Sequence, residues 1–310
     1  MADLKVKFCG KEFANPTVLA SGILGVTAAS WKNVVLNGAG GITTKSVWFN
    51  EHKGHPNPTM ITTPYYMLNA VGLPDAGLEK AKSEIGAYLS AKPAPLIVSI
   101  VGGKTEEFEK IAEQIAQLEV DIIEVNISCP NVESEFGRPF ACVSEDAKTV
   151  TAKVKAIVKK MNPNLPVVVK LSPNTENIVK IATTCAEAGA DGFCLINTLG
   201  PGLAINLETR MPILANKVGG ISGPAIKPLA VKLVNDVYKA TKLPIIGTGG
   251  VTTGEDALEM MMAGAILVGI GSAVYFRGID CFRKITNEMN EWCDKNDVKS
   301  LTEIIGTVKR

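Results

Sequence analysis

The sequence predicts an α/β protein of the (β/α)8 barrel class, with a small β-hairpin at its amino terminus. Short apolar segments rich in β-branched residues alternate with segments of helical spacing, and the chain holds eight such strand–helix units. No linker or change of composition separates the units, and 310 residues are enough for one barrel. We therefore expect a single domain over residues 1–310. A doubly wound parallel sheet is the alternative, although that class more often has fewer strands.

The elements follow one another in a regular order. Residues 5–8 and 12–14 are expected to form a hairpin that caps the bottom of the barrel. The eight strands are expected at residues 17–20, 41–44, 96–100, 121–126, 167–170, 192–196, 244–246 and 265–268. Helices are expected at residues 28–36, 78–89, 106–118, 146–160, 178–188, 226–240 and 255–263, with further helical segments at the end. Residues 47–75 and 199–223 are expected to be long loops, which are usually functional inside a compact domain.

Composition argues against several classes of protein. The net charge of +1 gives no broad basic surface, so nucleic acid is not an expected partner. Seven cysteines are an odd count and none forms a CxxC pair, which favours reduced thiols in the cytoplasm and no iron–sulfur or zinc site in this chain. No signal peptide or membrane span is expected. His52 and His55 are the only histidines, and a solvated loop explains them better than a metal site or a Ser-His-Asp triad.

Polar residues gather at the carboxyl ends of the expected strands, which meet at one face of a barrel. These ends carry Ser21, Lys45, Ser99, Asn126, Lys170 and Asn197. Residues 247–250 and 269–272 are glycine-rich turns after the last two strands, where barrels commonly hold phosphate through backbone amides. No acidic residue stands at the offset that a dinucleotide-binding fingerprint requires, so a phosphate cup is the better interpretation.

Cys129 lies in the sequence Asn126-Ile127-Ser128-Cys129-Pro130-Asn131, directly after a buried strand. A thiol on such a loop can take up a proton, and the flanking amides can hold a planar polar substrate. A buried structural cysteine would be the usual interpretation of a lone Cys. The polar residues at the other strand ends favour a functional role for Cys129 instead. Residues 69–74, in the first long loop, are expected to form a lid over the substrate.

These motifs together resemble dihydroorotate dehydrogenase, in its soluble class 1 form. The resemblance covers nearly the whole chain in the family's order and rests on residues 19–22, 44–46, 69–73, 126–131, 169–171, 196–198, 220–223, 247–250 and 271–272. It implies an FMN-dependent oxidoreductase that converts (S)-dihydroorotate to orotate in de novo pyrimidine (UMP) biosynthesis. Cys129 would be the catalytic base, while a hydride passes to FMN.

The resemblance also implies the binding residues. The substrate would be held by Lys45, Asn69, Ala70, Val71, Gly72, Leu73, Asn126, Asn131, Asn197 and Thr198. The flavin would be held by Ala20, Ser21, Gly22, Lys45, Ser46, Ser99, Asn126, Lys170, Ile196, Gly223, Gly249, Gly250, Gly271 and Ser272. Lys170 would stabilise negative charge on the reduced flavin.

Within class 1, residues 42–47 and 206–216 are most similar to the catalytic subunit of the NAD-linked type, class 1B. That similarity implies a homodimeric core joined to an electron-transfer subunit that carries FAD and a 2Fe-2S cluster, in a heterotetramer. A fumarate-dependent class 1A homodimer stays open.

Three more distant alternatives also stay open. A dihydropyrimidine dehydrogenase-type enzyme usually has His after the Cys-Pro pair, where this chain has Asn131. A barrel lyase or isomerase for a phosphorylated metabolite would use Lys170 as a Schiff base. A barrel that only binds a phosphorylated ligand would need no base at all.

Overall fold

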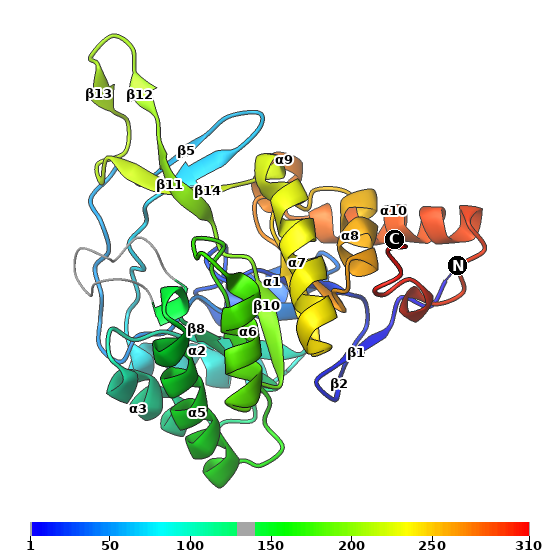
Figure 1. Ribbon diagram of the computed structural model, residues 1–310, viewed down its shortest axis with the longest axis horizontal. Coiled ribbons are helices and arrows are strands. Elements are labelled where there is room, and N and C mark those ends of the chain that lie inside the picture. The colour runs from blue at the N-terminus through cyan, green and yellow to red at the C-terminus, as the bar shows by residue number, and fades with distance from the viewer. Residues whose placement is uncertain (1, 129–139, 310) are drawn as a thin grey trace.

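A closed barrel of eight parallel strands forms the centre of the protein, in a computed structural model that describes residues 2–128 and 140–309 (Figure 1). The strands are β3 (Thr17–Leu19), β4 (Gly41–Thr43), β7 (Leu96–Ile100), β8 (Ile122–Asn126), β9 (Val167–Lys170), β10 (Gly192–Leu195), β15 (Ile245–Thr248) and β16 (Leu267–Ile270). Each strand pairs with the next one along the chain, and β16 pairs with β3. This last pairing confirms the barrel, because it closes the sheet on itself, whereas an open doubly wound sheet keeps two edge strands.

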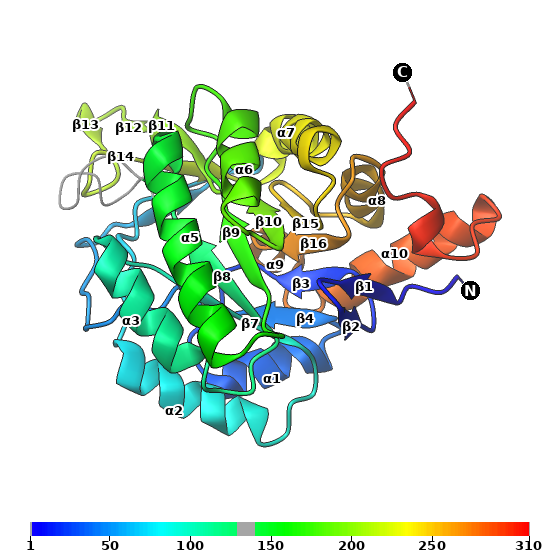
Figure 2. The ribbon, with the colours of Figure 1, turned by 60° about the horizontal axis from the view of Figure 1, so that its bottom comes forward.

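Helices surround the barrel (Figure 2). They are α1 (Ala28–Leu36), α2 (Leu78–Leu89), α3 (Thr105–Ile115), α5 (Ser144–Met161), α6 (Ile178–Glu187), α7 (Lys227–Thr241), α8 (Gly254–Met262), α9 (Ala273–Arg277) and α10 (Cys281–Lys295), with short 3-10 turns η1 (Phe140–Cys142), η2 (Pro224–Ile226) and η3 (Leu301–Glu303). In α3, Phe108, Ile111, Ala112 and Ile115 are buried. This spacing is one stripe of a helix, so α3 packs on the strands through a single apolar face.

The hairpin of β1 (Val6–Phe8) and β2 (Lys11–Phe13) covers the amino-terminal end of the barrel, as expected. A Cβ atom added at Gly41 would lie 2.6 Å from the ring of Phe13, and one at Gly192 would lie 3.5 Å from the ring of Phe8. These glycines begin β4 and β10, so the hairpin packs under the starts of two barrel strands. The opposite end, where the strands finish, is left for ligands.

The expectation of two long loops without secondary structure was wrong. Within them, a four-stranded sheet forms from β5 (Met60–Thr62), β6 (Met67–Asn69), β14 (Val218–Ser222) and β11 (Leu199–Leu203). We call it the roof sheet, because it contributes residues to the cavity at the barrel mouth. Its strands have three to five residues, and its central pairing joins Asn69 to Gly220. Strands so short, paired across so much chain, leave no local periodicity to detect.

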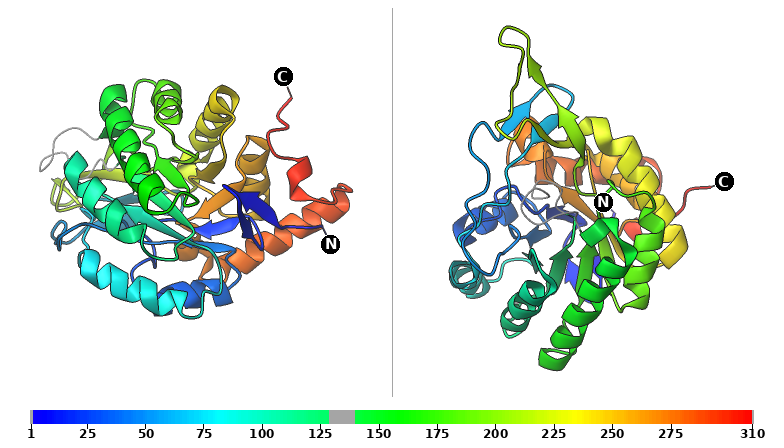
Figure 3. Two further views of the ribbon diagram at one scale, coloured as in Figure 1. Left: turned by 90° about the horizontal axis from the view of Figure 1, so that it is seen from below. Right: turned by 60° about the vertical axis from the view of Figure 1, so that its left-hand side comes forward.

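A second hairpin, of β12 (Ile205–Asn206) and β13 (Met211–Pro212), also lies in the second of these segments. It projects beyond the roof sheet, away from the barrel (Figure 1 and the right-hand view of Figure 3). The last two barrel strands also differ from expectation, since each runs two residues further. Gly247 and Gly269 are therefore inside strands, and only the later residues of each glycine motif form the turn.

Asp256 joins α8 to the start of α7, and its loss is expected to destabilise the fold. Its carboxylate accepts hydrogen bonds from the backbone N–H groups of Thr252 and Thr253 and from Lys227 Nζ at 2.7 Å. Asp256→Asn should lower the free energy of unfolding by about 1–2 kcal/mol, because it weakens a helix cap and an ion pair together. Denaturant unfolding measures this loss.

The same loss should depend on pH. Burial works toward a higher pKa for Asp256, but hydrogen bonds from Lys227, Thr252 and Thr253 outweigh it and lower the pKa below its usual 3.8. A lowered pKa in the folded state stabilises the protein above pH 3.8, and this contribution disappears as the pH falls toward the folded-state value. The wild-type advantage over Asp256→Asn should therefore shrink in acid. Asp146→Asn, at an exposed position in the first turn of α5, is the control. An equal effect in both variants would contradict the assignment.

Candidate active site

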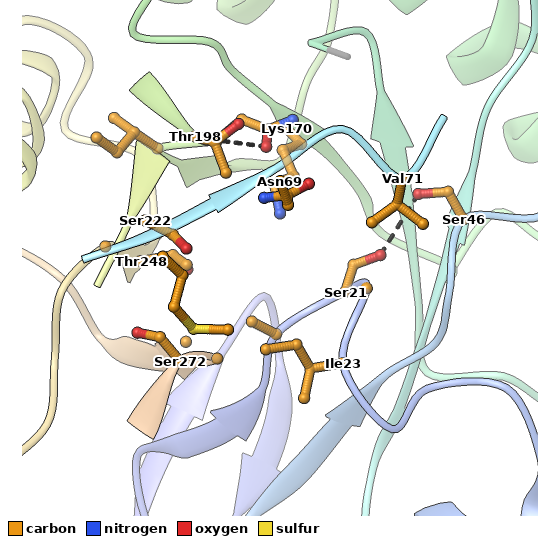
Figure 4. Close-up of a pocket in the computed structure, with 18 of the residues that line it drawn as sticks. Ser21, Ile23, Ser46, Asn69, Val71, Lys170, Thr198, Ser222, Thr248 and Ser272 are labelled. Atoms are coloured by element: carbon orange, nitrogen blue, oxygen red, sulfur yellow. Dashed lines mark hydrogen bonds between the residues drawn. The ribbon is translucent and has the colours of Figure 1, made fainter. Parts of the chain in front are cut away.

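A cavity of about 410 Å³ opens at the carboxyl ends of the barrel strands, under the roof sheet (Figure 4). Ser21 and Ser46 face one side of it, from the ends of β3 and β4, while Thr248 and Ser272 face it from the ends of β15 and β16. Asn69 from β6 and Ser222 from β14 come from the roof. Strand ends and roof together enclose a site within the size range of small-molecule ligand pockets.

Most of the residues that the sequence assigned to ligands line this cavity. They are Ala20, Ser21, Gly22, Lys45, Ser46, Asn69, Val71, Gly72, Leu73, Asn126, Lys170, Ile196, Asn197, Thr198, Gly223, Gly249, Gly250, Gly271 and Ser272. Cys129 and Asn131 lie outside the described residues. Ala70 and Ser99 do not line the cavity: Ala70 is buried in the cluster that packs the roof sheet, and Ser99 is buried behind Ser46.

Hydroxyl groups support the polar wall of the cavity. Asn126 donates from Nδ2 to Ser46 Oγ at 2.9 Å. Ser46 Oγ also lies 2.9 Å from Ser99 Oγ and 3.4 Å from Ser21 Oγ. Because these side chains are mostly buried, their hydrogen bonds replace those that water would make. Ser99 thus contacts a residue of the cavity and not the cavity itself.

Two lysines give the cavity positive charge. Lys170 ends β9, where its Cα lies opposite Asn126 of β8 and Cys194 of β10, and only 5% of its surface is exposed. Lys45 is half-buried at the end of β4, with its backbone N–H bonded to Gly25 O. Both positive charges would favour an anionic ligand.

The turn after β15 requires glycine, because its backbone has positive φ and neighbouring atoms leave no room for a Cβ. Gly249 and Gly250 have φ of +133° and +76°, and a Cβ at Gly250 would lie 2.7 Å from the backbone N of Lys227. Gly271 differs, because a Cβ there would lie 3.6 Å from Ala20 and 3.7 Å from Ile23. Protein packing would thus tolerate a side chain at Gly271, but that side chain would take up space in the cavity.

The segment of residues 69–75 is held in place from below. Trp48 Nε1 donates to Leu73 O at 3.1 Å, and the backbone N–H of Trp48 donates to Asp75 Oδ2 at 3.0 Å. His55 Nδ1 lies 3.2 Å from Ala70 O. The two histidines therefore serve this segment: His52 stacks on Trp48, and its Nδ1 lies 3.2 Å from Leu73 O. Most of the segment lines the cavity, through Asn69, Val71, Gly72, Leu73 and Pro74.

Five of the six cysteines in the described part of the chain are poor candidates for a base. Burial raises the pKa of Cys9 and of Cys194 to about 12, with Asp191 and Glu124 as second causes, and burial raises the pKa of Cys185 and of Cys281 to about 11. The pKa of Cys293 is also raised, by burial and nearby acidic groups. These thiols stay protonated at neutral pH, which makes them unreactive.

Sequence reasoning missed part of the lining, namely Ile23, Val26, Met60, Met67, Ser222, Ile226, Thr248, Val251 and Gly269, and it included Pro74 only in the expected lid. Thr248 and Gly269 stand within the two glycine motifs and could have been named from them. Met60, Met67 and Ser222 belong to the roof sheet, which no sequence pattern announced. Most of the others are apolar, and they form an apolar side of the cavity next to its polar wall.

The described residues contain no group of three or more His, Cys, Asp and Glu side chains arranged to hold a metal ion. Among the helices of residues 2–128 and 140–309, none has both the length and the apolar character to cross a membrane.

Fold and cavity define a (β/α)8 protein with a basic, amide-lined ligand site at the barrel mouth. The sequence matches the family described as dihydroorotate dehydrogenase over residues 3–292, and the chain belongs to this family. This membership favours the flavin oxidoreductase over the lyase and the non-catalytic binder.

Curated relatives extend over nearly the full length of the chain. The catalytic subunit of dihydroorotate dehydrogenase B (NAD(+)) from Methanocaldococcus jannaschii is 43% identical over 306 residues, which is 98% of this chain and 97% of the relative. The subunits of the same name from Pyrococcus horikoshii and from a Geobacter species are both 40% identical, covering 98% and 99% of this chain and 97% and 98% of the relatives.

Gly220 tests the contact between the roof sheet and the cavity wall. A Cβ at this position would lie 2.0 Å from Thr198 Oγ1 and 2.6 Å from Thr198 Cβ. Gly220→Ala should therefore displace Thr198 and lower the free energy of unfolding by about 1–3 kcal/mol. Thermal or denaturant unfolding measures the change.

Gly86→Ala is the matched control, because Gly86 lies in α2 with no atom within 4 Å of the added Cβ. This variant should gain about 0.5–1 kcal/mol from helix propensity. If Gly220→Ala were as stable as Gly86→Ala, the result would contradict the close packing of β14 against Thr198.

Proposed function

We propose that this protein oxidises (S)-dihydroorotate to orotate, a step of pyrimidine biosynthesis, with FMN bound in the cavity at the barrel mouth. The observation that carries the proposal is the convergence of its lining. Nearly all of the described residues that the family resemblance assigns to flavin and substrate line one cavity, although they come from distant parts of the chain. Family membership and the names of the relatives support the same activity.

The residues fit FMN in shape and in charge. Gly249, Gly250 and Gly271 leave backbone groups accessible without side chains, which suits a phosphate. Ile23 and Met67 offer apolar contact to a flat ring. Bound FMN would supply the acceptor for the hydride. Lys170, buried at the end of β9, would favour negative charge on the ring as that hydride arrives.

On the substrate side, the chain's own residues bind and orient. Lys45 would pair with a carboxylate, and Asn126 and Asn197 would hydrogen-bond the edge of a pyrimidine. Asn69, on the roof sheet, would cover the ligand and help to exclude water. Trp48 Nε1 donates to Leu73 O, and this hydrogen bond would hold the segment after Asn69 in position over the ligand.

We assign the base to Cys129. Its sequence neighbour Ser128 is fully buried and accepts a hydrogen bond from Nδ2 of Asn197, which lines the cavity. The raised pKa values of Cys9, Cys185, Cys194, Cys281 and Cys293 favour Cys129 by comparison. A thiolate in a closed, dry site can accept the proton that leaves substrate carbon.

Cys129→Ala should keep the yellow colour of bound FMN and lose the bleaching that dihydroorotate causes in the absence of oxygen. The expected fall in the bleaching rate is about 10²- to 10⁴-fold, as for loss of a general base. Stopped-flow absorbance measures it. Cys293→Ala, which removes a buried thiol from α10, should bleach at the wild-type rate. Bleaching at that rate by Cys129→Ala would refute the assigned base.

We further propose that this chain is the catalytic subunit of a class 1B enzyme. It would form a homodimeric core and pass electrons to NAD through a partner subunit with FAD and a 2Fe-2S cluster. The relatives' names, which include NAD(+) and a catalytic subunit, support this. Cys9, Cys185, Cys194, Cys281 and Cys293 are free thiols, which supports a reducing location in the cytoplasm.

Electron acceptors distinguish this class from the fumarate-dependent homodimer. The purified chain alone should reduce neither NAD nor fumarate at a useful rate with dihydroorotate. Co-expression with an iron–sulfur flavoprotein encoded in the same organism should give a stable complex that contains FAD and iron and reduces NAD. Steady-state turnover measures both. Rapid fumarate reduction by the chain alone would overturn the class 1B proposal and leave the oxidation of dihydroorotate standing.

A further inference from the structure

We propose that Ser128 is a positioning residue that fixes which atoms Asn126 and Asn197 present to the ligand. Ser128 is fully buried and does not line the cavity, whereas both asparagines do. Its hydroxyl lies between them, 2.9 Å from Asn126 Oδ1 and 2.8 Å from Asn197 Nδ2. The inference rests on the proposed function and deepens it, because it explains how the site would select one edge of a pyrimidine.

Backbone groups determine the direction of these hydrogen bonds. The N–H of Ser128 can only donate, and it donates to Asn126 Oδ1 at 3.2 Å. The C=O of Ser128 can only accept, and it accepts from Asn197 Nδ2 at 3.3 Å. The N–H of Thr198 donates to Asn197 Oδ1 at 2.8 Å. Neither amide can therefore turn over without placing two donors or two acceptors against each other.

The direction of the Ser128 hydroxyl follows from this. Because Asn197 offers it an N–H and Asn126 offers it an oxygen, the hydroxyl accepts from the first and donates to the second. The series of hydrogen bonds continues from Asn126, whose Nδ2 donates to Ser46 Oγ, and Ser46 Oγ lies 2.9 Å from Ser99 Oγ. A series of donors with one direction thus runs from Asn197, after β10, through Ser128 and Asn126 to Ser46, after β4, while the bond between Ser46 and Ser99 can take either direction.

This series leaves each asparagine with a single kind of bonding capacity. Asn126 Oδ1 already accepts two hydrogen bonds from Ser128, so Asn126 has only its second amide N–H left. Asn197 Nδ2 already donates two hydrogen bonds to Ser128, so Asn197 has only an acceptor position on Oδ1 left. The pair therefore presents one donor and one acceptor. A ligand edge with a C=O beside an N–H, as in a cyclic amide, satisfies both.

A purely structural role for Ser128 predicts something different. A buried serine that only fills space or ties strands together would affect all ligands of the same shape equally. A serine whose hydroxyl takes up the second acceptor position of Asn126 Oδ1 and the second N–H of Asn197 leaves each amide with one bonding group, and it should matter for a ligand with a fixed donor and acceptor. It should matter little for a ligand whose own groups can donate or accept, because that ligand adapts to the bonding groups that loss of the hydroxyl frees.

The test compares two ligands of the FMN-loaded protein. Orotate carries fixed C=O and N–H groups, while 3,5-dihydroxybenzoate keeps a carboxylate on a six-membered ring and carries hydroxyls that can donate or accept. Affinities are measured from the change in flavin absorbance on titration. Ser128→Ala should bind orotate about five- to tenfold more weakly and 3,5-dihydroxybenzoate with less than about twofold change, since one or two hydrogen bonds to a fixed polarity are lost.

Thr151→Val is the matched control, because it removes a fully buried hydroxyl from α5 that donates to Ala147 O, contacts Cys185 of α6 and does not line the cavity. It should leave both affinities unchanged. Equal losses for both ligands in Ser128→Ala, or no loss for either, would overturn the inference. If Ser128→Ala did not fold, Ser99→Ala would test the inference in its place. Its affinity for orotate, and not for 3,5-dihydroxybenzoate, should fall about twofold. Equal affinities of Ser99→Ala and wild type would then refute it.

Failure of the proposed function gives a different result. Wild-type protein that carries no flavin, or that binds no orotate, would refute the function before any variant is compared. Wild-type protein that binds orotate, with a Ser128→Ala variant that discriminates between the two ligands as the wild type does, would refute only the role of Ser128.

Discussion

The pairing of β16 with β3 is the constraint on which the rest of the structure depends. It sets Val268 opposite Thr17 and Ile270 opposite Leu19, and the backbone N–H of Ala20 donates to Ile270 O at 2.9 Å. Segments some 250 residues apart in sequence thereby become neighbours in one wall. Without this closure, Gly271 would not stand beside Ala20, and the strand ends would not form a closed ring around one cavity.

Closure also explains how so many polar groups are kept at low energetic cost. Each barrel strand is buried, and the interior tolerates Asn126, Ser128 and Ser99 only because their hydrogen bonds are made within the protein. The backbone at the end of β8 provides the fixed donor and acceptor that anchor this network. Precise placement of amides is thus a property of the strands and not of the flexible side chains themselves.

The barrel itself was predictable from the sequence, because buried parallel strands are continuous apolar runs and helices have a different period. The ligand residues at strand ends followed from the same logic, since these ends must meet. Ser99 shows the limit: its place at a strand end was correct, but only the structure reveals that Ser46 stands between it and the cavity.

The roof sheet and the role of Ser128 could not be predicted in this way. Asn69 meets Gly220 across 151 residues, and Ser128 meets Asn197 across 69. Such partners carry no shared spacing or composition, and tertiary contact alone selects them. Glycines 219 and 220 suggested a loop because their small size, needed here for close packing on Asn69 and Thr198, is more often a sign of a turn.

The roof sheet has a consequence for biosynthesis of the chain. Its two inner strands, β6 and β14, come from opposite halves of the polypeptide. The ribosome must therefore synthesise β14 before β6 can pair with it. Contacts this distant in sequence form late, because loop closure costs entropy before any contact repays it. A nascent chain that ends before residue 218 would therefore hold most of the substrate-side residues and yet have no covered site. Ligand capture during translation must wait until β14, which completes the roof sheet, and β16, which closes the barrel, have both emerged.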